Sequence, residues 1–304
     1  MNPVCGKEGD YMQIKDSKGQ RIFNVVNIIF MIFMITITLY PMLYVLFASL
    51  SDPSEYMAHQ GVLLKPLGLS LGSYKAVMKN PMILTGYRNT IFVVGVGVVF
   101  NVIMTALGAY VLSRKGLMLK GFLMFSIVFT MFFSGGLIPF YFTVKELRLD
   151  NTLWALIIPG LISTYNMIIM RTAFNGVPDS LEESAKLDGA SHWIILFKIM
   201  IPLTLPTIAV MVLYYGVAHW NSWFNAMIFI RKRELFPLQL ILREILIAND
   251  TNSMIQNANA GDQEMLSETI KFAVIIVSTV PILCLYPFVQ KYFVKGVMIG
   301  AVKG

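Results

Sequence analysis

The charged side chains that could do chemistry in this chain gather in one short stretch between Ser180 and Trp193. The stretch reads SLEESAKLDGASHW and holds Glu182, Glu183, Lys186 and Asp188. Only 13% of all residues are charged, against about 25% in an ordinary soluble domain. Lys186 follows Glu182 by four residues, a spacing at which the two can pair weakly on a helix. The pattern indicates a polar contact surface in an otherwise apolar chain.

No set of catalytic or metal-binding residues accompanies this stretch. The sequence has no G-x-x-x-x-G-K-[ST] phosphate loop, no H-E-x-x-H motif and no cysteine and histidine cluster with zinc spacing. Its three histidines do not assemble into a Ser/His/Asp site, and its two cysteines, Cys5 and Cys284, predict no disulfide framework. We therefore expect no enzymatic activity and no cofactor bound by this chain.

The segments around the stretch are apolar enough to require lipid. Of the 304 residues 56% are hydrophobic, and the mean hydropathy is +0.67. A membrane-spanning helix needs about 20 mostly apolar residues. The expected spans, all free of Asp, Glu, Lys and Arg, are 22–50, 89–113, 121–144, 151–170, 199–224 and 272–290. Because backbone groups in lipid must pair within their own segment, the sequence predicts an all-α integral membrane domain over 22–304, after a polar leader over 1–21.

The basic residues predict how these spans are oriented. They occupy alternate loops and both ends of the chain: Lys7, Lys15, Lys18, Arg21, Arg114, Lys115, Lys120, Arg171, Lys186, Lys198, Lys291, Lys295 and Lys303. The positive-inside rule then places both termini and a loop over 175–199 in the cytoplasm. The net charge of +7 therefore reflects membrane orientation and not nucleic-acid binding.

One basic group does not follow the positive-inside rule. It consists of Arg231, Lys232 and Arg233, which lie near the start of a large outer loop over 225–271. We interpret them either as a solvated loop base or as a contact for an external partner.

Glycine and proline interrupt four of the predicted spans. The interruptions are Ser134-Gly135-Gly136 with Pro139, Pro159-Gly160, Pro202 with Pro206, and Pro281 with Pro287. They predict either simple kinks or irregular backbone beside a translocation pathway. In the second span, Gly95, Gly97 and Gly108 are expected to allow close helix contacts.

The spans carry no group that would couple transport to an ion. They contain no Asp or Glu, which ion-coupled carriers use at membrane depth. His219, near the outer end of the fifth span, is expected to be neutral and hydrogen-bonded rather than a proton relay. The energy for transport must then come from another protein.

The Ser180 stretch is predicted to form two short helices joined at a glycine. Asp179 and Ser180 each precede a glutamate by three residues, which is the capping-box spacing. Gly189 fits the left-handed position after the first helix, and a second helix can begin at Ser191 and run into Pro202. Such a two-helix unit would suit a rigid contact that a soluble partner can move.

This stretch resembles the cytoplasmic E-A-A-x3-G-x9-I-x-L-P loop of the permease subunits of bacterial ABC importers. The match runs through Glu183-Ser184-Ala185, Gly189 and Ile199-Met200-Ile201-Pro202, with serine for the second-position alanine and isoleucine for leucine. The segments FSGGLIPFY, WALIIPG, WNSWFNAM, FPLQLILR and YFVKGVMIGAVKG are similar to the sugar-importer branch, in particular to oligosaccharide permeases that resemble the second membrane subunit of maltose importers. The resemblance covers nearly the whole chain after residue 21.

The resemblance implies a type I ABC importer permease fold with six transmembrane helices in the bacterial cytoplasmic membrane. It implies a second homologous permease, a cytoplasmic ATPase dimer that uses ATP and Mg²⁺, and an extracytoplasmic solute-binding protein that delivers an oligosaccharide. The loop would dock as a coupling helix into a cleft of the ATPase, with Glu183 making polar contacts. The residues expected to serve this coupling are Glu182, Glu183, Ala185, Leu187, Asp188, Gly189 and Ala190.

A pathway for a neutral sugar should offer aromatic rings together with amide and hydroxyl groups. The candidates are Tyr141, Tyr165, Asn166, Trp220, Asn221 and Trp223. The alternative is structural: an interfacial aromatic belt for the two tryptophans, and helix packing for Tyr165 and Asn166.

The substrate class leaves alternatives open. Because the spans hold no Arg or Lys, contacts to an acidic sugar are expected from the partner permease or the binding protein. Two other interpretations stay open: a type I importer permease for a non-sugar solute, and a non-catalytic membrane scaffold or sensor.

Overall fold

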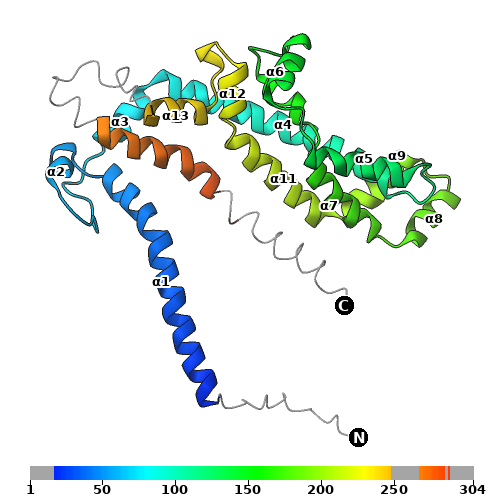
Figure 1. Ribbon diagram of the computed structural model, residues 1–304, viewed down its shortest axis with the longest axis horizontal. Coiled ribbons are helices and arrows are strands. Elements are labelled where there is room, and N and C mark those ends of the chain that lie inside the picture. Colours follow the sequence, from blue (N-terminus) through cyan, green and yellow to red (C-terminus); the bar gives the residue numbers. More distant parts are fainter. Residues whose placement is uncertain (1–16, 248–266, 285–286, 288–304) are drawn as a thin grey trace, which may run out of the picture.

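A computed structural model describes residues 17–247, 267–284 and 287, and its regular structure is helical apart from one bridge between Ser51 and Leu69 (Figure 1). The first elements are α1 (Lys18–Ser49), α2 (Pro53–Ala58), α3 (Gly72–Lys79), α4 (Pro81–Ser113), α5 (Lys120–Phe132), α6 (Leu137–Glu146), η1 (Leu153–Leu156), η2 (Ile158–Gly160) and α7 (Thr164–Asn175). Then follow α8 (Asp179–Leu187), α9 (His192–Ile194), the π-helix η3 (Ile195–Met200), α10 (Ile201–Leu203), α11 (Leu205–Trp220), α12 (Phe224–Phe229), η4 (Arg233–Leu235), α13 (Leu238–Ile247) and an unlabelled helix, Ser267–Cys284. The prediction of a helical protein is confirmed for this part of the chain.

Helix α4 forms the centre of the fold. Asn80 caps it, because its Oδ1 accepts from the backbone N of Met82 at 2.8 Å, and Pro81 occupies a first-turn position that needs no N–H partner. The helix therefore starts upstream of the predicted span 89–113 and includes Arg88. It packs against α7 and α11 along one part and against α13 along another, so the two larger hydrophobic cores of the bundle both include α4 residues.

Six segments have the length and composition of membrane spans. Three are single helices, α1, α4 and Ser267–Cys284, and three are pairs of helices bent at a short break. The pairs are α5 with α6 at 112°, Leu153–Gly160 with α7 at 49°, and His192–Leu203 with α11 at 85°.

These bends confirm that three of the four predicted interruptions break the helices, so no continuous helix covers 121–144, 151–170 or 199–224. At the fourth, Pro281 lies inside the continuous helix Ser267–Cys284. The remainder of the sixth predicted span, apart from Pro287, lies outside the described residues.

A buried amide holds the break after Pro159-Gly160 in place. The fully buried Asn101 of α4 donates from Nδ2 to the carbonyl oxygens of Gly160 and Leu161 at 2.7 and 2.9 Å. Its Oδ1 accepts from Nε2 of the buried His219 at 2.7 Å, so the prediction that His219 is hydrogen-bonded is confirmed. Irregular backbone at membrane depth needs such partners, and α4 and α11 supply them here.

Tyr215 of α11 satisfies the other side of the same break. Its hydroxyl lies 2.7 Å from Thr105 Oγ1 and accepts from the backbone N of Ser163 at 2.9 Å. Tyr215 and Thr105 are both buried. The two side-chain networks fix the bent fourth segment to α4 and α11 as one packed unit.

Of the three glycines in the second predicted span, which lies within α4, two permit the predicted close contacts. An added Cβ at Gly97 would lie 2.6 Å from His219 Nε2, and one at Gly108 would lie 2.9 Å from Met167 Sδ. Gly95 faces open space, with nothing within 4 Å, so its predicted helix contact is not formed within this chain.

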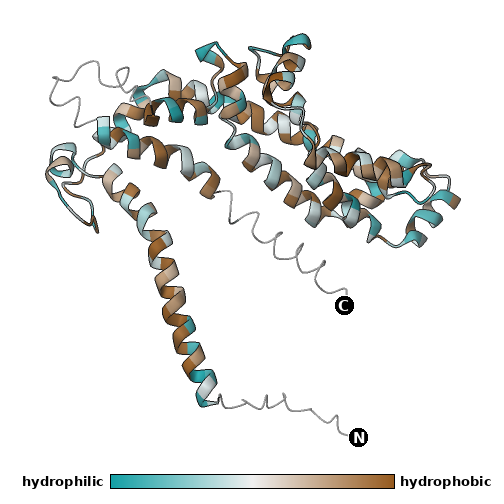
Figure 2. Ribbon diagram, viewed as in Figure 1, coloured by the Kyte–Doolittle hydropathy of each residue, from teal (hydrophilic) through white to brown (hydrophobic). Residues whose placement is uncertain are grey.

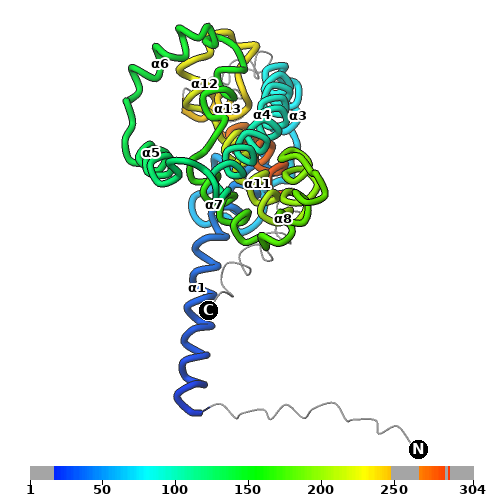
Figure 3. Tube along the Cα trace, turned by 90° about the vertical axis from the view of Figure 1, so that its right-hand side faces the viewer, coloured from blue at the N-terminus to red at the C-terminus, as the bar shows by residue number. Residues whose placement is uncertain are grey.

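Two apolar parts extend away from the packed bundle. Most of α1 projects outward, and none of its membrane-length window is buried (Figures 1 and 2). Only its last turns contact the chain, for example through a 2.7 Å hydrogen bond between Ser49 Oγ and the Tyr74 hydroxyl. Helices α5 and α6 form an arch on one side of the bundle (Figure 3). Apolar surfaces of this extent need lipid or another protein to cover them.

Candidate functional site

The Ser180 loop consists of two short helices joined by a glycine, as the sequence predicts. At the end of α8, Ala190 N donates to Ala185 O at 2.9 Å, and Gly189 N donates to Lys186 O at 3.0 Å. Gly189 has a φ of +76°, which glycine adopts without the steric cost of a Cβ. Ser191 caps the next helix, because its Oγ accepts a backbone N–H three residues on at 3.4 Å. The glycine therefore sets the angle between the two helices.

The first turn of α8 differs from the capping-box prediction, which is wrong. Pro178 occupies the cap position with extended backbone, and Asp179 and Ser180 already lie inside the helix, so no side chain caps it. Asp179 pairs instead with Lys115 Nζ at 2.5 Å, and this hydrogen bond raises the pKa of Lys115. Both side chains are more than half exposed, so the pair stabilises the loop only slightly.

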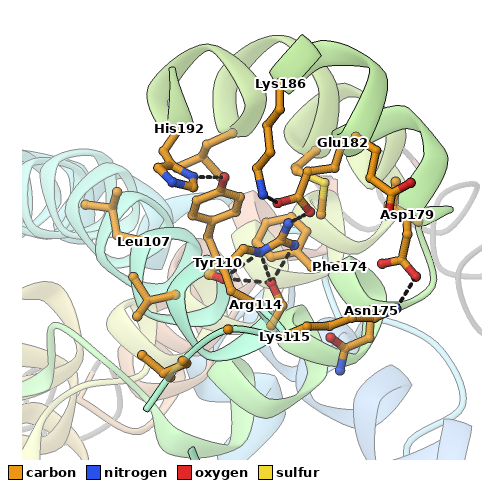
Figure 4. Close-up of a pocket in the computed structure, with 18 of the residues that line it drawn as sticks. Leu107, Tyr110, Arg114, Lys115, Phe174, Asn175, Asp179, Glu182, Lys186 and His192 are labelled. Carbon is orange, nitrogen blue, oxygen red and sulfur yellow. Dashed lines mark hydrogen bonds and ion pairs between the residues drawn. The ribbon is translucent and has the colours of Figure 1, made fainter. Parts of the chain in front are cut away.

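Glu182 is the inward-facing carboxylate of the loop. Its side chain is only 16% exposed; Arg114 Nη1 donates to its Oε2 and Lys186 Nζ donates to its Oε1 at 2.8 Å (Figure 4). The Arg114 guanidinium lies 4.5 Å from the centroid of the Tyr110 ring, and its Nη2 donates to Ser113 Oγ at 2.8 Å. Because Arg114 directly follows α4, the ion pair joins the loop to the end of that helix.

A second contact joins α4 to the other helix of the loop. The Tyr110 hydroxyl and His192 Nδ1 are 3.0 Å apart and hydrogen-bonded (Figure 4). Between these contacts, α4, α7, α8 and α9 enclose a cavity of about 950 Å³, whose lining includes Leu107, Phe174 and Trp193. Two contacts, at Glu182 and at His192, thus attach the loop to the end of α4.

Tyr110, Arg114 and His192 were not predicted from the sequence as parts of this site. Arg114 and Glu182 are 68 residues apart, and no periodicity connects them. The only signal was the position of Arg114 directly after an apolar segment.

The seven predicted coupling residues divide into inward and outward sets. Ala185 and Ala190 pack against the hydrophobic core that includes Phe174, Glu182 is held by Arg114, and Gly189 forms the turn. The exposed side chains are those of Glu183, which also lines the cavity, Leu187 and Asp188. Leu187 is 90% exposed, so the outward surface is one apolar side chain flanked by carboxylates.

Three of the six sugar-pathway candidates have structural contacts inside the chain. Trp220 is 7% exposed and donates from Nε1 to Ser278 O at 3.2 Å, and Asn166 is buried. Asn221 Nδ2 donates to Val217 O at 3.0 Å, which closes the end of α11. These contacts hold the three side chains within the fold, and their role in a sugar pathway stays a prediction.

The other three candidates are accessible. Tyr165 is 55% exposed. Tyr141 of α6 stacks on Phe229 with the ring planes 8° apart, and Trp223, 38% exposed, precedes α12. No hydrogen bond or ring contact joins any two of the six candidates within the described part of the chain.

Comparison with known proteins places these features in a family. Residues 13–299 match the family model described as "Binding-protein-dependent transport system inner membrane component". The polygalacturonan/rhamnogalacturonan transport system permease protein YtcP of Bacillus subtilis is 37% identical over 93% of this chain and 99% of its own length. Protein LplC of the same organism is 38% identical over 95% of this chain and 97% of its own. A chain of a bacterial ABC transporter involved in the import of the acidic polysaccharide alginate has a TM-score of 0.83 at 33% identity, covering 91% of this chain and 99% of that one.

Proposed function

The chain belongs to the binding-protein-dependent transport system inner membrane component family, and from this premise we propose that it forms, with a second permease, the translocation pathway of an ATP-driven oligosaccharide importer. Membership makes it a permease subunit, a multi-pass membrane protein that is not itself the ATPase. Its relatives include a permease named for polygalacturonan and rhamnogalacturonan transport and a chain of an alginate importer. These names support a sugar over a non-sugar solute.

We infer six membrane spans, with both termini and the Ser180 loop on the cytoplasmic side of the bacterial cytoplasmic membrane. The three single helices and three bent pairs support the count, and the placement of Arg114, Lys115 and Arg171 at one end supports the orientation. In this orientation α12, α13 and residues 231–233 lie on the outer side.

The second permease would cover surface that this chain leaves open. Helix α1 is long enough to span a membrane but has none of its apolar window buried, and the arch of α5 and α6 exposes phenylalanines on both sides of its break. Lipid can cover part of this surface. A homologous subunit packed against α1 and the arch would also enclose a pathway between the two chains.

The observation that carries the proposal is the construction of the Ser180 loop. Gly189 fixes the angle of a two-helix unit, and Arg114 fixes that unit to α4. Glu183, Leu187 and Asp188 remain exposed for a cytoplasmic ATPase dimer. Force applied by the ATPase to these three residues would therefore reach the central helix of the fold directly.

Gly189→Val tests this assignment. A β-branched residue is strongly disfavoured at φ +76°, so the angle between α8 and α9 must change. We expect uptake of labelled oligosaccharide by cells expressing the complete importer to be lost, while the amount of permease in the membrane stays at the wild-type level.

The matched control for this test is Gly116→Val, in the neighbouring loop, where an added Cβ meets nothing within 4 Å and φ is not in the left-handed range. It should transport normally. Wild-type uptake by the Gly189 variant would overturn the coupling role.

A further inference from the structure

Two of the accessible pathway candidates each have an arginine beside them, one over its ring and the other at its hydroxyl. The Arg243 guanidinium of α13 lies 5.0 Å from the ring centroid of Trp223. Arg231 Nη2 donates to the Tyr141 hydroxyl at 3.4 Å. Trp223 precedes α12 and Arg231 follows it, so this short helix lies between the two pairs along the chain. We call these four residues, Tyr141, Trp223, Arg231 and Arg243, the arginine rim.

The two arginines of the rim have no carboxylate partner among the described residues. Arg233, by contrast, donates to Glu244 at 2.9 Å. Arg231 is exposed and Arg243 is partly exposed, so both keep guanidinium donors directed to solvent or to a ligand. A guanidinium beside an aromatic ring keeps its charge and its planar fork of N–H groups.

A free guanidinium beside an aromatic ring suits one class of sugar. A guanidinium binds a carboxylate through two parallel N–H···O bonds, and an exposed indole face offers apolar contact to the C–H face of a sugar ring. A neutral sugar would use the ring and leave the guanidinium without a partner. A sugar that carries a carboxylate, a uronic acid, uses both groups.

We propose that the arginine rim binds the carboxylates of an acidic oligosaccharide where it enters the pathway, with Arg243 as the main specificity-determining residue. The inference rests on the proposed importer function and names its substrate class. It also revises the expectation that contacts to an acidic sugar come only from the partner subunits, since Arg231 and Arg243 lie just outside the spans.

A purely structural role predicts a different outcome. If Arg243 only held α13 against α12 through the Trp223 ring, its removal would reduce the transport of every substrate by the same factor. A role in recognition affects carboxylated substrates selectively. The experiment therefore compares two substrates that differ only in charge.

The complete importer, reconstituted in proteoliposomes with its partners, is given a short oligogalacturonate and the fully methyl-esterified form of the same length. Arg243→Gln should lower uptake of the free acid about tenfold, the effect of losing one charge-assisted hydrogen bond. It should leave uptake of the ester within about twofold of wild type. Arg243→Lys, which keeps the charge but not the fork, should lie between Arg243→Gln and wild type.

Arg148→Gln is the matched control, because it removes the same charge from an exposed arginine of the outer hairpin that no described carboxylate or ring contacts. It should transport both forms like the wild type. Complex assembly, measured by size-exclusion chromatography, shows whether each variant folds.

The proposal is overturned if Arg243→Gln imports the acid at the wild-type rate, or if it slows acid and ester equally. Where the wild-type importer does not carry the ester, a rise in KM for the acid in Arg243→Gln with partial recovery in Arg243→Lys supports the proposal, and an unchanged KM overturns it. Import of neutral arabino-oligosaccharides but of no acidic one overturns this inference and leaves the proposed function intact. Import of no oligosaccharide at all overturns the proposed function itself.

Discussion

At the Ser180 loop Glu182 is mostly buried between two cations, whereas Arg243 of the arginine rim lies over the Trp223 ring and Arg231 donates to the Tyr141 hydroxyl, and neither contacts a described carboxylate. The inward charge of the loop is paired in an attachment to α4. The two guanidinium charges of the rim have no counter-charge in the described part of the chain. A site that transmits force needs internal partners, and a site that selects a charged substrate needs free donors, so the two regions are suited to different tasks.

The largest expected effect comes from removing the buried charge of the loop. Glu182→Ala leaves the Arg114 guanidinium, only 17% exposed, without its carboxylate. Breaking a fully buried pair from one side costs about 3–5 kcal/mol, and we expect the lower end of this range because both side chains keep some exposure. We expect a lower thermal unfolding temperature of the purified complex and loss of uptake.

Glu183→Ala is the matched control, because it removes an exposed neighbouring carboxylate. If Glu183→Ala lowers the unfolding temperature of the complex as much as Glu182→Ala does, the burial of the Glu182 charge is not the cause of the effect. Replacing both Glu182 and Arg114 with methionine should restore most of the stability, since no charge is then left without a partner.

A smaller effect is expected at the outward surface of the loop. Leu187→Asp changes a side chain that is 90% exposed, so the stability of the permease alone should change by less than about 0.5 kcal/mol. Binding of the ATPase should weaken by about 2 kcal/mol, roughly thirtyfold, because a buried leucine contact is lost. The dissociation constant of the ATPase measures this.

Leu64→Asp provides the comparison, since Leu64 is 73% exposed and lies on the proposed outer side. It should leave ATPase affinity unchanged. If Leu187→Asp and Leu64→Asp bind the ATPase with equal affinity, Leu187 is not part of a docking surface for the ATPase.

The smallest effect concerns the ring of the arginine rim. Trp223→Leu removes the face on which Arg243 rests, an interaction worth about 1 kcal/mol at a partly exposed site, and should slow uptake of an acidic oligosaccharide about fivefold. Trp154→Leu is matched to it: Trp154 is 40% exposed and has ring contacts to Phe92 and Phe100. Its variant should transport normally, and equal losses in the two variants would argue against a special role for the rim.

The sequence predicted those features that depend on neighbours in the chain. The apolar segments, the breaks near Pro159-Gly160 and Pro202, the left-handed Gly189 and the Ser191 cap all follow from local rules. The capping box failed for a local reason too, because Pro178 takes the cap position and moves the helix start onto Asp179.

The features that the sequence did not predict depend on contacts between distant residues. Arg114 meets Glu182 only after α4 and the loop have packed, and Asn101 reaches the carbonyls of Gly160 and Leu161 across the bundle. The arginine rim was missed for a related reason. Arg231 and Arg243 were assigned to a loop, and only the fold places them on Tyr141 and Trp223.

The π-helix η3 gives the connection between the loop and α11 a tolerance for a change in residue number. Ile195–Met200 hold one wider turn directly before α10 and α11. A π turn holds one residue more than an α turn, so the loss of one residue there can close it to an α turn without turning the helix that follows. In the regular helix α11 no turn can absorb such a loss, and a deletion before Tyr215 would rotate Tyr215 and His219 by about 100° about the helix axis. Both side chains would then turn away from Thr105 and Asn101, and the backbone N of Ser163 would lose its partner.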